Sequence, residues 1–320
     1  MDSTAQDISE ARRRSFVLQK QLEKFVLRRD SSLLFKTLPP KYEWVLHVRM
    51  HTRQVWCPCP TVPHHTTGFT QSIVYVHQKQ VYKDFLRYRR ESQAGGNHND
   101  ILSSFHMCRS IINHPDLAYG DSFRYPFADA SRVRPHGSIS CATPLSAPMF
   151  LQDNHQFGNA GRSGKTVVLR SLLTATFRSG EKTVVFSQSI PTLDLLENFL
   201  GARTLVDPEQ FQTSAGVIDP EFGSNPGVKA LVEGQRYYER IDGSTPLSTR
   251  FEVIRRFNSP SSPIQVLIVS TKACSEGVNM VGASRVVLFD VCWNPCHDYE
   301  AMCRLHRFAA SQPLDIRCCS

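Results

Sequence analysis

The sequence predicts an α/β fold in which residues 161–320 form a doubly wound parallel sheet. Short apolar runs rich in β-branched residues alternate there with segments of helical periodicity, and the runs are uninterrupted by polar residues. Such runs are typical of parallel strands that helices cover on both faces. Polar residues follow the runs directly, and ligands of these sheets bind at the carboxyl ends of the strands.

The chain is predicted to begin with an amphipathic helix over residues 8–29. Apolar side chains recur there at near-helical spacing among charges, namely Phe16, Leu18, Leu22, Phe25 and Val26. Leu38-Pro39-Pro40 ends this pattern, and VLHVRM at residues 45–50 predicts a strand.

Two helices between irregular segments are predicted next. Residues 56–68 contain three prolines and predict a loop or insertion. Residues 73–86 pass from alternating to helical periodicity, and residues 101–117 predict a helix closed by Asn113-His114-Pro115. Residues 118–162 lose periodicity and are rich in Pro, Ser, Gly and Asn, which predicts a linker.

Helices and strands then alternate regularly. The predicted helices are residues 167–180, 193–200, 246–258 and 297–308, and the predicted strands are residues 183–188, 237–241, 266–271 and 285–290.

Composition narrows the class of protein. Lys and Arg outnumber Asp and Glu by 37 to 29, which suits a polyanionic partner without requiring one. The ten cysteines lack regular spacing and the N-terminus is polar, so we expect reduced thiols in an intracellular protein. No apolar run approaches the roughly 18 to 20 residues that cross a bilayer, so we expect no membrane segment.

Two apparent ligand sites are interpreted as incidental. Residues 158–166, GNAGRSGKT, imitate a phosphate-binding loop, but Asn159 replaces its first glycine and the preceding residues make a poor strand. We interpret them as a glycine-rich linker in which Lys165 lies near a helix start. Four potential ligands lie close together in sequence, namely Cys57, Cys59, His64 and His65. Their spacing fits no common zinc template, so no metal site is predicted.

Residues 266–308 carry the strongest indication of function in the sequence. A buried strand ends at Ser270-Thr271-Lys272, a turn with Gly277 and Asn279 follows, and a second strand ends at Asp290. Trp293-Asn294-Pro295 then introduces a predicted helix that bears Arg304 and Arg307. Two arginines three residues apart share one helical face and can bind phosphate oxygens in a bidentate fork. A solvated helical face is the alternative.

The order of these motifs resembles that of the Swi/Snf-type helicase-like ATPases. KTVVFSQS with LDLLENFL is similar to the first strand and helix of that family's second lobe, and YERIDGSTPLSTRFEVIRRFN is similar to its Asp-Gly-Ser/Thr turn and following helix. The run from VLIVST to CWNP matches the fifth motif, and CRLHRF resembles the sixth. FVLRRD, LPPKYE, QVYKDFL and INHPDL resemble landmarks between the lobes, and WNPCHDYEAMCRLHR looks most like the subgroup of ATRX and the androgen-receptor-interacting helicase.

The resemblance implies a domain order. Residues 161–320 would be a RecA-like helicase C-terminal lobe, truncated at its end. Residues 51–160 would be a helical connector with an insertion and a flexible linker, and residues 1–50 the end of a first motor lobe. The intact motor would be a nuclear, ATP-dependent chromatin remodeller that translocates on double-stranded DNA, with other remodeller or transcription-factor subunits as partners.

The resemblance also implies roles for single residues. Arg307, and secondarily Arg304, would be arginine fingers, with Gly277 and Asn279 at the nucleotide edge and ATP and Mg²⁺ held mainly by the first lobe. The predicted DNA-phosphate contacts are Ser187, Gln188, Ser270, Thr271 and Lys272. Ordinary strand-end turn chemistry is the alternative for these five. For Trp293 a core position, lobe packing and a functional role all stay open.

The chain also departs from the family's pattern. No segment matches the family's phosphate-binding loop or D-E-A-H box. Cys274-Ser275 replaces a glycine pair in the fifth motif, and residues 308–312 replace a bulky residue followed by Gly-Gln. These departures leave a non-catalytic DNA- or partner-binding fragment as the alternative function.

Overall fold

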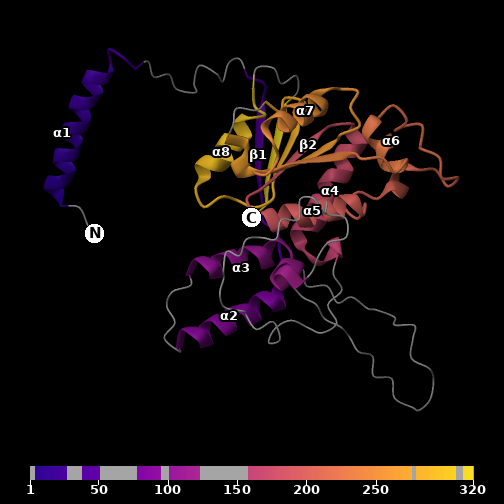
Figure 1. The fold of residues 1–320 in the computed structure, drawn as a ribbon, viewed down its shortest axis with the longest axis horizontal. Helices are drawn as coiled ribbons and strands as arrows, with labels where there is room; N and C mark the ends of the chain where they lie inside the picture. The colour runs from indigo at the N-terminus through magenta and orange to yellow at the C-terminus, as the bar shows by residue number, and fades with distance from the viewer. Residues whose placement is uncertain are drawn as a thin grey trace. The chain divides into compact units, whose positions relative to one another are not determined.

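Six short segments pair into one all-parallel sheet (Figure 1). They are β1 (Lys41–Leu46), β2 (Thr183–Ser187), β3 (Tyr238–Ile241), β4 (Val266–Ser270), β5 (Arg285–Leu288) and β6 (Leu314–Cys319), in the order β1-β6-β5-β2-β4-β3. The structure, a computed structural model, describes residues 4–26, 38–50, 78–94, 101–122, 158–275, 279–307 and 313–319. The sheet lies within the compact unit Pro39–Ser320.

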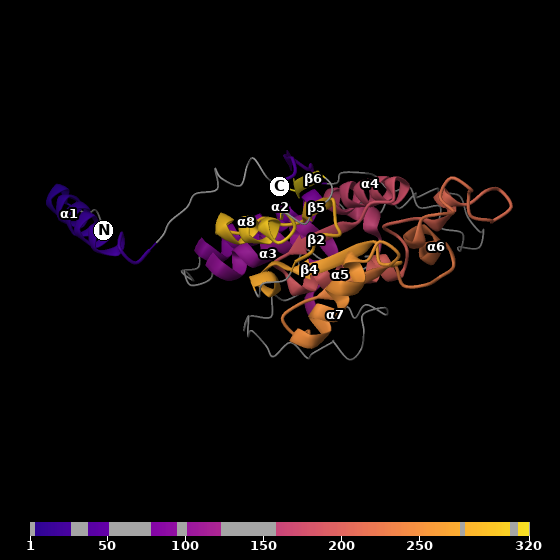
Figure 2. The same cartoon turned by 90° about the horizontal axis from the view of Figure 1, so that it is seen from above.

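Helices cover both faces of the sheet. α4 (Gly164–Ser179), α5 (Ile190–Gly201) and α6 (Pro226–Val232) pack on one face, and α7 (Leu247–Asn258) and α8 (Pro295–Cys303) on the other. Seen from above, β6, β5, β2 and β4 follow one another with α4 and α8 on opposite sides (Figure 2). The predicted doubly wound parallel α/β fold is therefore confirmed.

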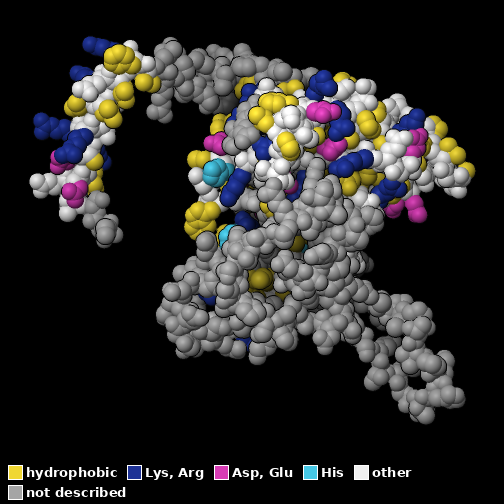
Figure 3. Space-filling model, in the orientation of Figure 1, with side chains coloured by type: hydrophobic (Ala, Val, Ile, Leu, Met, Phe, Trp, Pro, Cys, Tyr) yellow, Lys and Arg dark blue, Asp and Glu magenta, His cyan; other side chains and the backbone are white. Residues whose placement is uncertain are grey.

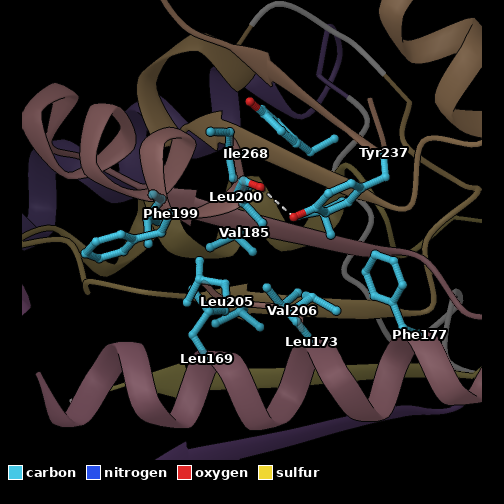
Figure 4. Packing of buried hydrophobic residues seen from close by; sticks show 14 of the residues in the cluster. Leu169, Leu173, Phe177, Val185, Phe199, Leu200, Leu205, Val206, Tyr237 and Ile268 are labelled. Carbon is cyan, nitrogen blue, oxygen red and sulfur yellow. Dashed lines mark hydrogen bonds between the residues drawn. The ribbon is translucent and has the colours of Figure 1, made fainter. Parts of the chain in front are cut away.

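The alternating faces of β2 explain its uninterrupted apolar run. Val185 belongs to the cluster under α4, whereas Val184 and Phe186 belong to the cluster under α7 and α8. On the first side Leu169 and Leu173 of α4 point toward Val185 (Figure 4). Each of these side chains is fully buried or nearly so, and burying one stabilises the fold by about 1.5–3 kcal/mol.

A charged strand, β3, is buried because its charges are paired. Arg240 is 3% exposed, and its guanidinium donates to Glu197 Oε2 at 2.9 Å and to Asp242 Oδ2 at 3.0 Å. Asp242 in turn accepts from the Ser244 amide at 2.8 Å, which forms the turn into α7. Unpaired charges would be costly in a buried strand. The network is therefore what allows the sequence YERI to form a strand whose four residues are all buried.

Two helices precede the sheet's main part. α2 (Gln78–Ala94) and α3 (Ile101–Asn113) correspond to the predicted connector helices, and α3 ends at Asn113 as predicted. The 3₁₀ segment η2 (Pro115–Ser122) follows. Of the predicted linker, residues 158–162 contain the 3₁₀ turn η4 (Ala160–Arg162) and bury Ala160, whereas residues 123–157 lie outside the described residues.

The structure corrects the predicted strand at residues 45–50. The strand lies at Lys41–Leu46, because it pairs along its whole length with β6, from Lys41 beside Leu314 to Leu46 beside Cys319. β1 therefore belongs to this sheet, although the predicted boundary placed it at the end of a first lobe. The domain boundaries themselves stay predictions.

The unit Met1–Leu38 contains one described helix. α1 (Ala5–Leu22) begins at a capping box in which Thr4 and Asp7 bond each other's backbone amides. None of its residues is buried, and three of its apolar side chains, Phe16, Val17 and Leu18, are more than half exposed. The predicted amphipathic helix is confirmed over residues 8–22. It ends earlier than predicted, because residues 23–25 form a turn, and its last predicted residues, 27–29, lie outside the described part.

Candidate functional site

The carboxyl ends of β2 and β4 are aligned. Ser187 pairs in register with Ser270, so the predicted DNA-contact residues of both strands lie at one edge of the sheet. Ser187 is fully buried and its hydroxyl donates to Asp290 Oδ2 at 2.7 Å. The Gln188 amide donates to Asp290 Oδ1 at 2.8 Å, and its side chain donates to the Val291 carbonyl at 2.6 Å. In this structure Ser187 and Gln188 therefore bind the loop after β5.

The crevice between β2 and β5 is filled by polar side chains from two other segments. The chain leaves β2 toward β3 and leaves β5 toward β6, in opposite directions along the sheet, so the topological switch point lies between these two strands. Asn113, from the end of α3, donates through Nδ2 to Asp290 Oδ2 at 2.9 Å and to Thr192 Oγ1 at 3.1 Å. The connector thus occupies the place where an open sheet of this class would bind a ligand.

Lys165 completes this cluster. Its Nζ donates to the Phe289 carbonyl at 3.1 Å and to Asn113 Oδ1 at 3.4 Å, and the side chain is 6% exposed. Burial lowers the pKa of Lys165 below its ordinary value, and the negative charge of Asp290 opposes that shift. In this structure the ammonium group therefore binds the protein itself.

Further contacts fix the connector to the start of α4. The Ser163 hydroxyl donates to the Asn113 carbonyl at 2.7 Å, and Gln78 Nε2 donates to the Ile112 carbonyl at 2.6 Å. His114 Nε2 bonds the Asn159 carbonyl at 3.1 Å, and its Nδ1 accepts from the Asp116 amide at 3.2 Å. The start of α4 and the INHPDL segment at the end of α3 are therefore one contact region.

The segment after β4 presents a lysine. β4 continues into the 3₁₀ turn η6 (Thr271–Ser275), which Arg250 of α7 supports by donating to the Ala273 carbonyl at 3.4 Å. Thr271 and Ser270 are buried, whereas Lys272 is exposed. Of the five predicted DNA contacts, only Lys272 has an exposed side chain in this structure.

The predicted shared helical face of Arg304 and Arg307 is wrong. α8 ends at Cys303 with Arg304 as its C-cap, so both arginines lie in the turn after the helix. The turn forms because Leu305 is buried and His306 Nε2 bonds the Pro39 carbonyl at 2.8 Å. These contacts draw the chain away from the helix axis.

This turn lies beside one end of the fifth motif. The Met280 amide donates to the Arg304 carbonyl at 3.1 Å, which brings Asn279 next to the arginine turn. Arg307 is half-buried, and its Nε donates to the Cys303 carbonyl at 3.2 Å. The structure therefore brings Asn279, predicted at the nucleotide edge, next to the two predicted arginine fingers, while Gly277 lies outside the described residues.

Trp293 does not belong to the core. Its side chain is 86% exposed, and its ring meets Phe105 of α3 edge-on, with ring centroids 5.5 Å apart. The sequence did not indicate this contact, because residues 105 and 293 belong to segments that only the fold brings together.

The turn between β5 and α8 yields a chemical prediction. Burial raises the pKa of the Cys292 thiol to about 12, and the hydrogen bond to Asp298 and that residue's charge add to the shift. Cys296, at the start of α8, is exposed. At pH 8 only about one Cys292 thiol in 10⁴ is ionised, so iodoacetamide is expected to alkylate Cys296 far faster. Peptide mass spectrometry over time measures both rates, and the unfolded chain in urea is the control. Equal rates in the folded protein would contradict this account of the turn.

The described ranges contain neither a candidate metal site nor a membrane-spanning helix. Among those residues, no group of three or more His, Cys, Asp or Glu side chains could hold a metal ion, and no helix is long and apolar enough to cross a membrane. Cys57, Cys59, His64 and His65 lie outside them.

Comparison with known proteins identifies the family. Residues 227–309 match the helicase conserved C-terminal domain. The mouse protein Helicase ARIP4 is 31% identical over 99% of this chain and 22% of its own length. The human DNA repair and recombination protein RAD54-like is 31% identical over 88% of this chain and 29% of its own, and the Drosophila melanogaster transcriptional regulator ATRX homolog is 26% identical over 98% and 27%. The chain thus spans less than a third of the length of these relatives.

A solved structure supports the fold. The Sulfolobus solfataricus SWI2/SNF2 ATPase core in complex with dsDNA has a TM-score of 0.50 and 16% identity, over 95% of this chain and 46% of that chain. Together with the sequence similarity and the all-parallel sheet, this places the chain in the Swi2/Snf2-type helicase-like family, as its RecA-like C-terminal lobe.

Proposed function

We propose that this chain works as the second motor lobe of an ATP-dependent, duplex-DNA-translocating chromatin remodeller. One observation carries the proposal. The segment after β4 carries the exposed Lys272 at its second residue, and further along the chain the Met280 amide bonds the carbonyl of Arg304. A single short segment therefore has one end suited to DNA phosphates and the other beside the arginine turn.

The nucleotide end supplies donors for an anion. Arg307 and Arg304 would stabilise charge on the γ-phosphate of ATP, with Asn279 beside them. Gly277 lies outside the described residues and stays a predicted nucleotide contact. Guanidinium and amide groups fit phosphate oxygens, whereas Mg²⁺ requires oxygen ligands, which the described residues of this turn do not cluster. ATP, when bound, supplies the phosphoryl group, and Mg²⁺ would be held mainly by the first lobe.

The DNA end predicts a specific binding behaviour. The chain is expected to bind duplex DNA weakly, without sequence preference and with a steep loss of affinity as salt rises, because only phosphate contacts are available. Lys272→Ala is expected to weaken binding to every duplex tested. It should also reduce by about one unit the slope of the logarithm of affinity against the logarithm of salt concentration, which is called the salt slope below. Fluorescence anisotropy with labelled duplexes between low and physiological salt measures both effects.

The matched control is Lys229→Ala. Lys229 is 61% exposed on α6 and pairs with Glu233 at 3.8 Å, outside the carboxyl edge of the sheet. Its removal should leave affinity and salt slope near the wild-type values. An affinity that stays flat from low to physiological salt would contradict DNA as the partner.

A second candidate is a non-catalytic DNA- or partner-binding module. The hydrogen bonds of Lys165 favour this second candidate. Lys165 is the lysine of the segment that imitates a phosphate-binding loop, and in this structure its ammonium group binds the protein and not a phosphate. The two functions share a nuclear location and the duplex-binding behaviour. They separate on one measurement, namely whether DNA stimulates ATP hydrolysis once a first lobe is present.

A further inference from the structure

An open groove of about 1150 Å³ lies between α4 and the segment that follows α5. Its α4 wall is an exposed stripe of the helix, next to the buried stripe that contains Leu169 and Leu173. The opposite wall comes from residues 203–210, and residues 158–161 line the groove as well. The described lining includes neither Lys272 nor the arginine turn, so the groove is distinct from the proposed DNA and nucleotide ends.

Three arginines line this groove. Arg170 and Arg178 are exposed on α4, and Arg203 is half-buried on the opposite wall. None of the three guanidinium groups forms a hydrogen bond or ion pair with the part of the chain that the structure describes. Asp207 is the one carboxylate of the described lining, so positive charge is in excess. Figure 3 shows several basic side chains on the visible face of the lobe around α4 and α6.

Arg203 occupies a backbone position that favours glycine. α5 ends at Gly201, and Arg203 follows with a φ of 57°, in the left-handed region. Its amide bonds the Leu200 carbonyl at 3.1 Å, which closes the end of the helix. Glycine is the usual residue in such a position, because a Cβ is disfavoured there. The backbone alone therefore gives no reason for an arginine, whose side chain reaches the groove.

We propose that the groove binds an acidic segment of a partner protein in extended form, with carboxylates of the segment on Arg170, Arg178 and Arg203. The two arginines of α4 are eight residues apart, which is about 12 Å along the helix axis. In an extended chain, side chains four residues apart point to the same side and lie about 13 Å from each other. Two carboxylates at that spacing can therefore each meet one arginine. Ser171 and Ala175 lie between them, and these small side chains leave room for the backbone of the segment.

The groove favours a peptide over a nucleic acid. Asp207 Oδ1 accepts from the Glu209 amide at 3.0 Å, and its second oxygen has no donor among the described residues. A peptide can donate a backbone N–H to that oxygen while its carboxylates meet the arginines. A phosphate backbone is negative at every nucleotide, so Asp207 would repel it. The volume also exceeds the roughly 300–1,000 Å³ of a small-molecule site, which suits an extended segment.

The test uses the full 320-residue chain and a fluorescein-labelled peptide of alternating Glu and Ser, about twelve residues long so that it spans the α4 arginines. By anisotropy, the wild type is expected to bind this peptide and not the matched peptide with Gln in place of Glu. Arg170→Ala and Arg178→Ala should each weaken binding about 3- to 5-fold, and the double variant about 10- to 25-fold. Arg255→Ala is the matched control, since Arg255 is an exposed arginine on α7, on the other face of the sheet.

Arg203→Gly separates peptide binding from folding. Glycine fits the left-handed backbone, so this variant should unfold at a urea concentration at least as high as the wild type does. It should nevertheless bind the peptide about 3- to 5-fold more weakly. A loss of binding in a variant that is no less stable comes from the missing guanidinium group and not from unfolding.

Two results would overturn the proposal. If the three groove variants bind the peptide as the wild type does, or if Arg255→Ala weakens binding equally, the attraction comes from the net charge of +8 and not from the groove. If the groove variants weaken binding of a labelled duplex and leave peptide binding unchanged, the groove belongs to nucleic acid. The proposed function is tested separately, because Lys272, whose substitution tests duplex binding, does not line the groove.

Discussion

Asp290→Ala is expected to destabilise the lobe by about 3–5 kcal/mol. The carboxylate accepts from Ser187, the Gln188 amide and Asn113, and it lies 3% exposed near the buried ammonium group of Lys165. Removing it leaves three donors without their acceptor and a buried cation without its compensating charge. Urea unfolding followed by circular dichroism measures the loss as a lower midpoint.

A control and a double mutant sharpen this test. Asp207→Ala removes only the cap of a short 3₁₀ turn and should cost about 1 kcal/mol. In Asp290→Asn combined with Lys165→Met, the cation is removed together with its counter-charge, so the double variant should lose less stability than the sum of the two single variants. Additive losses would show that Lys165 and Asp290 do not depend on each other and would contradict the network described here.

The inner strands could be predicted because their burial is visible in the sequence. β2 and β4 are buried at every position, and therefore their runs are apolar throughout. β6 has the sequence LDIRCC, in which only Leu314, Ile316 and Cys319 are buried, so it carries no such run. The edge strand β1 pairs only with β6, a partner more than 260 residues away, so neither of these two strands could be predicted without the other. α6 has only seven residues, too few for a periodic pattern.

Site residues that lie within one sequence motif could be predicted from the sequence. Site residues that only the fold brings together could not. Lys272 lies at a strand end that its own sequence predicts. Asn113, Lys165 and Asp290 come from three segments. In the sequence, Asn113 marks a helix end, Lys165 belongs to a segment that imitates a phosphate-binding loop, and Asp290 ends a strand. Only the strand order brings them into one crevice. The predicted helix over residues 297–308 would have carried Arg304 and Arg307. It ends at Cys303, because burial of Leu305 outweighs the helical pattern of the sequence.

Arg307→Ala is expected to lower the rate constant for ATP hydrolysis by about 10³- to 10⁵-fold once the chain is fused to a first motor lobe that carries a phosphate-binding loop. Its guanidinium would meet charge that develops on the transferred phosphoryl group, so the loss should fall on kcat and not on DNA affinity. In this structure Nε bonds the Cys303 carbonyl at 3.2 Å, a contact that about 1 kcal/mol suffices to break.

Two variants control for folding and for DNA binding. Arg304→Ala should cost less, because the contact that holds Met280 uses the Arg304 backbone carbonyl and survives the substitution. Lys272→Ala should reduce duplex affinity and leave hydrolysis at saturating DNA near the wild-type rate. DNA-stimulated phosphate release and duplex anisotropy on the same fusion separate the two effects. Near-wild-type hydrolysis by Arg307→Ala would refute the arginine-finger assignment, because a solvated arginine at this turn would affect neither activity.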